Sequence, residues 1–287
     1  MAALVVPGVL FLSGCSKEAA NGFLPVPDRN ATNQTAKIID LWNGSWVAAL
    51  SVGALVWGLM IWVMIVYRRR RDQTGLPAQV RYNIPLEILY TVVPIMMVGG
   101  LFTLTAQAQA DIIDTKPTPD LKVNVVGAQW KWDFNYLDSN VYEVGVQAQT
   151  DGTDRPVAGL PTLYLPVNKR VEFELTSRDV VHSFWIPAFL MKMDTIPGVE
   201  NKFQVVPQVT GTYQGKCSEL CGEYHSEMLF NVKVVSQAEY DQHMADLKAR
   251  GNVGKLDTNL GRSTTPPGGA VPNNPQSRNG SESQGNA

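Results

Sequence analysis

A twelve-residue stretch in the last third of the chain concentrates side chains that bind metal ions. Residues 217–228 read Cys-Ser-Glu-Leu-Cys-Gly-Glu-Tyr-His-Ser-Glu-Met, so two thiols, an imidazole and a thioether follow one another as Cys-x3-Cys-x3-His-x2-Met. Thiolate and imidazole ligands select copper or zinc over magnesium or calcium. Zinc sites use cysteine, histidine and carboxylate ligands, so the methionine favours copper.

The number of sulfur ligands argues against a single blue-copper ion. Such a site uses one cysteine, two histidines and a weak axial methionine, whereas this stretch has two cysteines and one histidine. Two thiolates that bridge two copper ions would resolve the difference, provided that a second histidine comes from elsewhere. The chain has three histidines, at 182, 225 and 243, and His182 is the strong candidate. The alternative is that Cys217 and Cys221 form a disulfide or pack as core thiols.

The complete motif resembles the dinuclear copper (CuA) loop of cytochrome c oxidase subunit 2. The segment His182–Pro187 resembles the family's His-Ser-Phe-Trp-x-Pro stretch, and residues 191–197 resemble the stretch that follows it. The resemblance covers roughly residues 40–235. It implies six copper ligands, all matched in residue type: His182, Cys217, Glu219 through its backbone carbonyl, Cys221, His225 and Met228.

The same resemblance implies three further roles. The side chain of Glu219 would help to hold a magnesium or manganese ion at the interface with subunit 1, for which a carboxylate is a suitable hard ligand. Trp130 would receive electrons from cytochrome c, although Lys131 replaces an aromatic residue usual in the family and the alternative for this segment is strand core. Glu87 would feed protons into a channel of subunit 1; the alternative is a carboxylate that stabilises a helix N-terminus. Tyr90 stands where the family has tryptophan.

Two apolar runs predict a transmembrane helix hairpin. Trp46–Tyr67 carries no charge and is long enough to cross a hydrocarbon core of about 30 Å. Four arginines follow at 68–71, and positive charge marks the cytoplasmic side of a membrane. A second run, from Ile88 to about Ala106, returns the chain to the outer face, so both ends of the hairpin are expected outside the cytoplasm.

The N-terminus predicts export. Leu4–Leu12 is mostly apolar and leads into Leu-Ser-Gly-Cys, which resembles the lipobox of a bacterial lipoprotein with a lipid on Cys15. An ordinary secretory signal is the alternative, and the basic segment that normally begins a signal peptide is missing. An exported N-terminus agrees with the orientation of the hairpin. We expect a signal at 1–14, an extracytoplasmic segment at 15–40 and the hairpin at 41–110.

From Leu121 the chain consists of short β-rich runs, several of which alternate apolar and polar residues. Many short strands without intervening helices predict a sandwich or barrel, and the resemblance implies a cupredoxin-like Greek-key sandwich over 111–236. The predicted strands are Leu121–Ala128, Leu163–Val167, Arg170–Thr176, Phe203–Val206 and Met228–Val235. Residues 237–287 are expected to form a short helix, Gln237–Lys248, and a disordered tail from Gly251, since the tail is rich in Gly, Pro, Ser and Asn. No function is assigned to Val141–Pro161.

Charge and cysteine usage restrict the partners. A net charge of −2 and a pI near 5.9 do not indicate nucleic-acid binding, which is associated with a basic domain. Between Asp111 and Arg250 there are 19 acidic and 13 basic residues, an excess that would steer a basic partner toward this domain. The chain has no Cys-x-x-Cys-His motif and therefore no covalently bound c-type heme. The electron donor must then be a separate protein.

Together with these observations, the resemblance implies subunit 2 of a bacterial cytochrome c oxidase, a multi-pass protein of the plasma membrane with its copper domain on the extracytoplasmic side. It would accept electrons from cytochrome c and pass them to heme in subunit 1, which reduces oxygen to water and translocates protons; subunit 3 is a further partner. A copper chaperone is one rival, but it would have a thioredoxin-like βαβ pattern and no His and Met after the cysteines. A quinol oxidase subunit 2 is the other, with the same hairpin and sandwich but without this copper centre.

Overall fold

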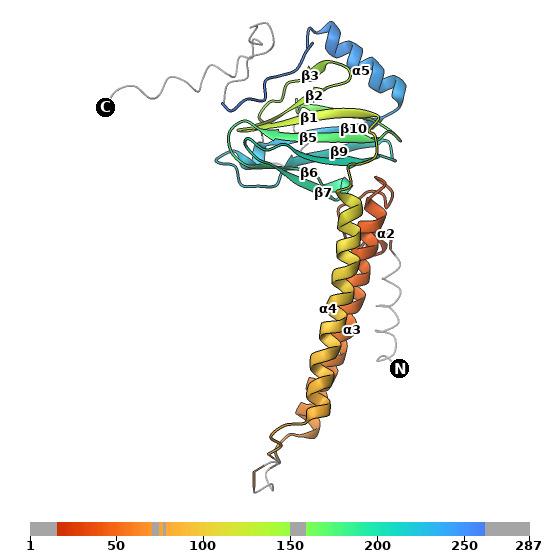
Figure 1. The fold of residues 1–287 in the computed structure, drawn as a ribbon, viewed down its shortest axis with the longest axis vertical. Coiled ribbons are helices and arrows are strands. Elements are labelled where there is room, and N and C mark those ends of the chain that lie inside the picture. The colour runs from red at the N-terminus through yellow and green to blue at the C-terminus, as the bar shows by residue number, and fades with distance from the viewer. Residues whose placement is uncertain (1–15, 71–74, 77–78, 150–158, 262–287) are drawn as a thin grey trace, which may run out of the picture. The chain divides into compact units, whose positions relative to one another are not determined.

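The computed structural model describes residues 16–70, 75–76, 79–149 and 159–261, and it divides the chain into two compact units (Figure 1). The first unit runs to Lys116 and includes Ala188–Leu190, and the second contains the remaining residues from Pro117 onward. The signal-like segment with Cys15, the fourth arginine of the basic run, part of Val141–Pro161 and the tail beyond Gly261 lie outside the described residues.

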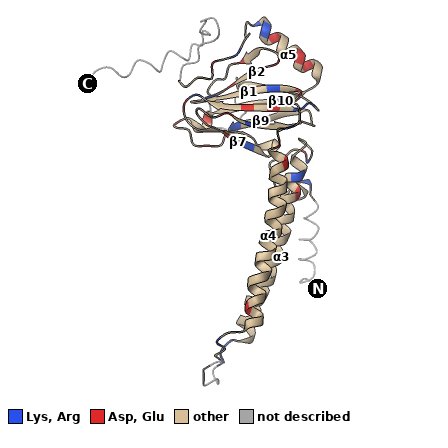
Figure 2. Ribbon diagram, viewed as in Figure 1, with Lys and Arg blue, Asp and Glu red and all other residues tan. Residues whose placement is uncertain are grey.

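The first unit contains the predicted helix pair, α3 (Thr35–Val66) and α4 (Ile84–Ile112), preceded by a short helix α2 (Lys17–Ala20). By length and composition, α3 and α4 are both candidates for membrane spans. Lys37 near the start of α3 donates to the Asp111 carboxylate near the end of α4 at 2.8 Å, so the two helices are antiparallel. Figure 2 shows almost no charge along either helix, as a hydrocarbon environment requires.

Both helices are longer than the apolar runs predicted. Helix α3 begins at Thr35 and not near Trp46, because hydropathy defines the apolar part of a helix and not its first turns. The segment predicted at 15–40 contains helix α2 and the first residues of α3. Asn83 caps α4, since its side chain accepts the N–H of Leu86 at 3.2 Å, and this cap sets the helix start ahead of Ile88.

The second unit is a sandwich of two five-stranded sheets, so the predicted all-β fold is confirmed. One sheet has the order β3-β2-β1-β5-β8 and the other β4-β10-β9-β6-β7; the pairs β1–β5 and β4–β10 are parallel and the remaining pairs antiparallel. The strands are β1 Leu121–Ala128, β2 Lys131–Tyr136, β3 Val141–Glu143, β4 Thr162–Pro166, β5 Val171–Ser177, β6 His182–Ile186, β7 Met191–Thr195, β8 Asn201–Val205, β9 Gly211–Cys217 and β10 Leu229–Val235.

Buried aromatic rings join the two sheets. Trp132 of β2 lies 5.4 Å from Phe184 of β6 and 5.9 Å from Phe230 of β10, measured between ring centroids. All three side chains are almost completely buried. Edge-to-face aromatic pairs at such distances add to the stability that burial of apolar area provides. This core fixes β6 and β10 relative to each other, and β9 pairs with both of them, so the three strands that lead into the metal-binding candidates are held together.

The chain after the sandwich is more ordered than its composition predicted. Helix α5 (Gln237–Ala249) corresponds to the helix predicted at Gln237–Lys248, and it starts at a capping box between Ser236 and Glu239. The expected disorder from Gly251 is wrong for residues 251–261, which continue along the domain. Leu256 is buried, and its N–H donates to the Asn135 side chain at 2.8 Å. This segment has few apolar residues of its own but packs on the core that β2 provides.

Candidate metal centre

Strand pairing brings two distant parts of the sequence together at the copper loop. His182 is the first residue of β6 and Cys217 the last residue of β9, and these strands pair with Phe184 opposite Cys217. The loop then returns to β10 through the 3-10 turn η3 (His225–Glu227). The N–H of Cys217 donates to the carbonyl of Met228 at 3.0 Å, which closes the base of the loop.

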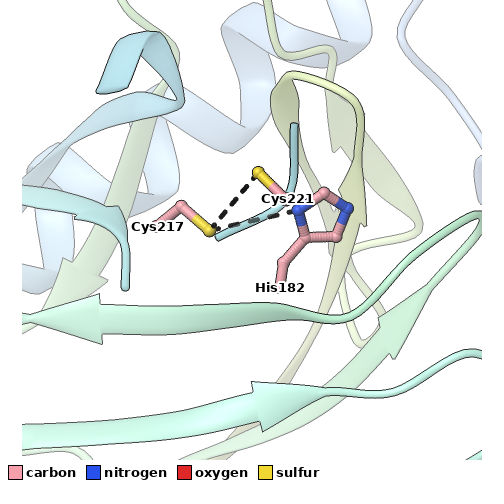
Figure 3. Close-up of side chains that lie close together, drawn as sticks. All are labelled: His182, Cys217 and Cys221. Carbon is pink, nitrogen blue, oxygen red and sulfur yellow. Dashed lines mark hydrogen bonds between the residues drawn. The ribbon is translucent and has the colours of Figure 1, made fainter. Parts of the chain in front are cut away.

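His182, Cys217 and Cys221 form the centre of the cluster, and all three are buried (Figure 3). Their ligand atoms lie within 4.8 Å of one another, with Cys217 Sγ 3.9 Å from Cys221 Sγ and 4.0 Å from His182 Nδ1. Both cysteines are free thiols. A disulfide needs a sulfur–sulfur distance of about 2.05 Å, so the disulfide alternative does not describe this structure.

The other three predicted ligands surround this pair of thiols. Cys221 Sγ lies 3.5 Å from His225 Nδ1 and 3.9 Å from Met228 Sδ. The backbone carbonyl oxygen of Glu219 lies 3.2 Å from Cys217 Sγ. The structure therefore brings the donor atoms of all six predicted ligands together around two sulfur atoms. Two thiols, two imidazoles, one thioether and one carbonyl form a donor set that fits soft copper ions.

The two thiols differ in acidity. Burial opposes ionisation of Cys217, but the His182 ring and backbone hydrogen bonds outweigh it and lower the pKa of this thiol. Burial and the neighbouring Cys217 raise the pKa of Cys221 to about 12. Cys221 therefore keeps its proton at neutral pH until a metal replaces it, and metal binding to both thiolates must release protons.

Three residues that the sequence analysis did not identify hold the ligands in place. Asp179 accepts a hydrogen bond from His182 Nε2 at 2.8 Å, and the side chain of Gln129 donates to the Cys221 carbonyl at 2.7 Å. Trp132 Nε1 donates to the Met228 carbonyl at 3.3 Å. The Asp three residues before the predicted ligand His182 is the one local signal that could have suggested such a partner.

Trp130 lies in the turn between β1 and β2, half-buried, and not within a strand. The strand-core alternative applies to Trp132, which is fully buried. The Trp130 ring packs edge-on against Tyr224 of the copper loop at 4.8 Å between centroids. Gly222 allows this approach, because it has φ +126° and an added Cβ would lie 3.2 Å from the Trp130 ring.

The two predicted carboxylate sites differ in their surroundings. Glu219 is exposed, so its carboxylate is free to reach beyond the loop. Glu87 belongs to the other unit, in the first turn of α4, where its carboxylate accepts the N–H of Asn83 at 2.8 Å. That contact is the helix-capping role expected of the alternative interpretation.

A pair of membrane-type helices and a β-sandwich with a buried His/Cys/Cys cluster define a membrane protein with a candidate copper site. Residues 121–235 match the family model described as cytochrome C oxidase subunit II, periplasmic domain. A probable cytochrome c oxidase subunit 2 of Streptomyces avermitilis is 44% identical over 88% of this chain and 87% of its own length. The cytochrome c oxidase subunit 2 of Mycobacterium tuberculosis is 32% identical, over 85% and 80% respectively.

The chain therefore belongs to the cytochrome c oxidase subunit 2 family, and it is a subunit of a heme–copper oxidase. Among solved structures, the periplasmic domain of subunit II of cytochrome oxidase from Bradyrhizobium japonicum is 32% identical. That similarity covers 47% of this chain and 97% of the other, with a TM-score of 0.42.

Proposed function

We propose that this chain accepts electrons from a cytochrome c at a dinuclear copper centre and passes them to heme in subunit 1, where oxygen is reduced to water and protons are translocated. The observation that carries the proposal is the convergence of two buried thiols with His182, His225 and Met228. Bound copper would supply the one-electron redox chemistry. The six ligands would be His182, Cys217, Cys221, His225, Met228 and the Glu219 carbonyl.

The protein's own contribution is rigidity. Hydrogen bonds hold the copper loop at its base, between Cys217 and Met228, and at its middle, between Cys221 and Gln129. His182 is completely buried and bonded to Asp179. A donor set that cannot move keeps nearly the same geometry in both oxidation states, which lowers the reorganisation that accompanies electron transfer. Burial of the thiols also excludes water from the centre.

Trp130 is the proposed point at which electrons enter. It is half-buried, so one part of the ring remains available to a donor protein while another part contacts Tyr224. Its neighbour Gln129 is bonded to Cys221, so the turn and the copper loop are directly connected. The acidic excess of the domain supports a basic cytochrome c as the donor.

The remaining assignments extend this proposal to the membrane and the partner subunits. The helix hairpin would cross a bacterial plasma membrane with Arg68–Arg70 on the cytoplasmic side and the copper domain outside. Glu219 would share a magnesium or manganese ion with subunit 1, and Glu87 would deliver protons to that subunit. A lipid on Cys15 would add a second anchor. Subunits 1 and 3 would cover part of the exposed apolar surface of α3 and α4.

Rapid mixing of the purified oxidase with reduced cytochrome c tests the direction and the site of electron transfer. Trp130→Phe is expected to slow the first phase of copper reduction while the copper content stays unchanged. Trp185→Phe is the matched control, since Trp185 of β6 is also partly exposed but its ring lies under the ammonium group of Lys216 on β9. A normal rate in Trp130→Phe together with a slow rate in Trp185→Phe would show that electrons enter elsewhere.

A further inference from the structure

The carboxylate of Asp179 lies directly behind the proposed copper ligand His182. Its Oδ1 is 2.8 Å from His182 Nε2, and the side chains are 6% and 0% exposed respectively. An ionised carboxylate can accept hydrogen bonds but cannot donate them. The proton between the two groups is therefore on His182 Nε2, and Nδ1 presents its lone pair. Nδ1 is the ring nitrogen that lies near Cys217 Sγ.

The second oxygen of the same carboxylate binds the turn that carries Trp130. Asp179 Oδ2 accepts the backbone N–H of Gln129 at 2.7 Å. The Gln129 side chain then donates to the Cys221 carbonyl, also at 2.7 Å. His182, Asp179, Gln129 and Cys221 are therefore linked in one continuous hydrogen-bonded bridge. It connects a ligand on β6 to the copper loop and passes through the residue next to Trp130.

We propose that Asp179 and Gln129 are positioning residues, which hold His182 in its metal-binding tautomer and orientation and fix Trp130 relative to the copper loop. The inference rests on the proposed copper function. Histidine ligands of metals usually donate their second ring N–H to a carboxylate or carbonyl, and loss of that partner typically weakens metal affinity or activity by about 10- to 100-fold. One carboxylate thus contacts both the ligand His182 and the turn that carries Trp130.

Two simpler roles for Asp179 are insufficient. It accepts the N–H of Val180 at 2.7 Å, as a turn residue would, but this local bond requires neither His182 nor Gln129 as a partner. It could also attract a basic donor protein as a surface charge. A side chain that is 6% exposed and bonded through both oxygens is poorly placed to act by charge alone.

The test uses the full-length chain in detergent, loaded with copper. Asp179→Ala removes the hydrogen bonds to His182 and to Gln129. It should lower copper affinity about 10- to 100-fold, shift the reduction potential and alter the copper electron paramagnetic resonance spectrum. Gln129→Ala should alter the spectrum less, because His182 keeps its partner, but should slow electron input from cytochrome c. Asp194→Asn, at an exposed site in the same domain, is the control and should change neither.

Asp179→Asn is the second variant, which tests the proposal even if Asp179→Ala fails to fold. The amide has the same shape as the carboxylate and retains one acceptor oxygen. That oxygen can serve His182 or Gln129 but not both, so the spectrum or the rate of electron input must still change. Unchanged affinity, spectrum and potential in all Asp179 variants would overturn the inference. The same holds if the only effect were a salt-dependent rise in the KM for cytochrome c, which would indicate a docking charge.

Hydrogen exchange of the metal-free chain separates this inference from the proposed function. The Gln129 amide should exchange slowly in the wild type and faster in Asp179→Ala, whether or not copper binds. Equal exchange in both would refute the bridge. A wild-type chain that binds no copper, but retains the protected amide, would instead refute the copper function and leave the bridge in place.

Discussion

Gly127→Ala tests how tightly strand β1 fits against the ligand His182. A Cβ at position 127 would lie 2.9 Å from His182 Cδ2 and 3.1 Å from Thr195 Oγ1. Carbon atoms in favourable contact are about 3.5–4.0 Å apart, so the imidazole must move by about 0.6 Å or more. The ring has no free direction, because it is completely buried and bonded to Asp179 at 2.8 Å.

The size of this shift determines the expected effect. Metal–ligand distances in a well-formed site lie within about 0.2 Å of their standard values. The required shift of the ring is larger than this range, so copper affinity should fall about 10- to 100-fold, as for other losses of ligand orientation. Overpacking of the domain at Gly127 should also cost about 1–3 kcal/mol of unfolding free energy. The two effects are separable, because the stability loss is present without metal.

Copper affinity is measured by competition with a chelator, and stability by denaturant unfolding of the metal-free chain. Gly53→Ala on α3 is the control for copper affinity, since an added Cβ there meets nothing within 4 Å, and this affinity should match the wild type. Its unfolding free energy should not fall, because alanine stabilises a helix interior relative to glycine by about 0.5–1 kcal/mol. If Gly127→Ala bound copper as tightly as the wild type with an unchanged reduction potential, the close fit between β1 and His182 would not control the site.

Three further predictions concern the thioether, a thiol and a partly buried histidine. Met228→Leu should retain copper but shift its reduction potential, because methionine is a weak ligand; complete copper loss by metal analysis would contradict this. Cys221→Ser should abolish the dinuclear site and leave at most one copper per chain, whereas two retained coppers would exclude bridging thiolates. Burial and the charge of Arg250 lower the pKa of His243 to about 4, against about 6.5 in an unfolded chain. The unfolded state therefore binds this proton first, and the metal-free domain should lose about 1–2 kcal/mol, after allowance for partial exposure, as pH falls from about 6.5 to about 4. His243→Phe keeps the ring stacked on Tyr164 and should remove this part of the pH dependence in denaturant titrations; an identical slope would refute it.

Local sequence patterns were sufficient to predict much of the fold. Strand β1 was predicted with its observed bounds, Leu121–Ala128, because its apolar run is bounded by polar residues and a turn. The ends of α3 and α4 were not predicted, since polar first turns have no hydropathy signal. Residues 251–261 are ordered through a contact with Asn135, which is far away in the sequence. Amino-acid composition cannot predict such a contact.

Some residues of the candidate site could likewise be predicted from the sequence, and others could not. Five of the six proposed ligands lie within one twelve-residue stretch, so spacing alone could indicate them. His182 was found by counting ligands and from the resemblance, and its approach to Cys217 depends on the pairing of β6 with β9. Asp179 and Gln129 were missed because their contact spans 50 positions and depends on how the turn after β1 meets the segment before β6.

The central claim is that two copper ions share the two thiolates of Cys217 and Cys221. The most direct measurement is the copper content of the full-length chain in detergent, combined with its electron paramagnetic resonance spectrum. Two coppers per chain and a multiline spectrum, from one unpaired electron shared by two nuclei, are expected. One copper with a simple four-line spectrum would contradict the dinuclear centre, and a chain that binds no copper would contradict the electron-accepting function itself.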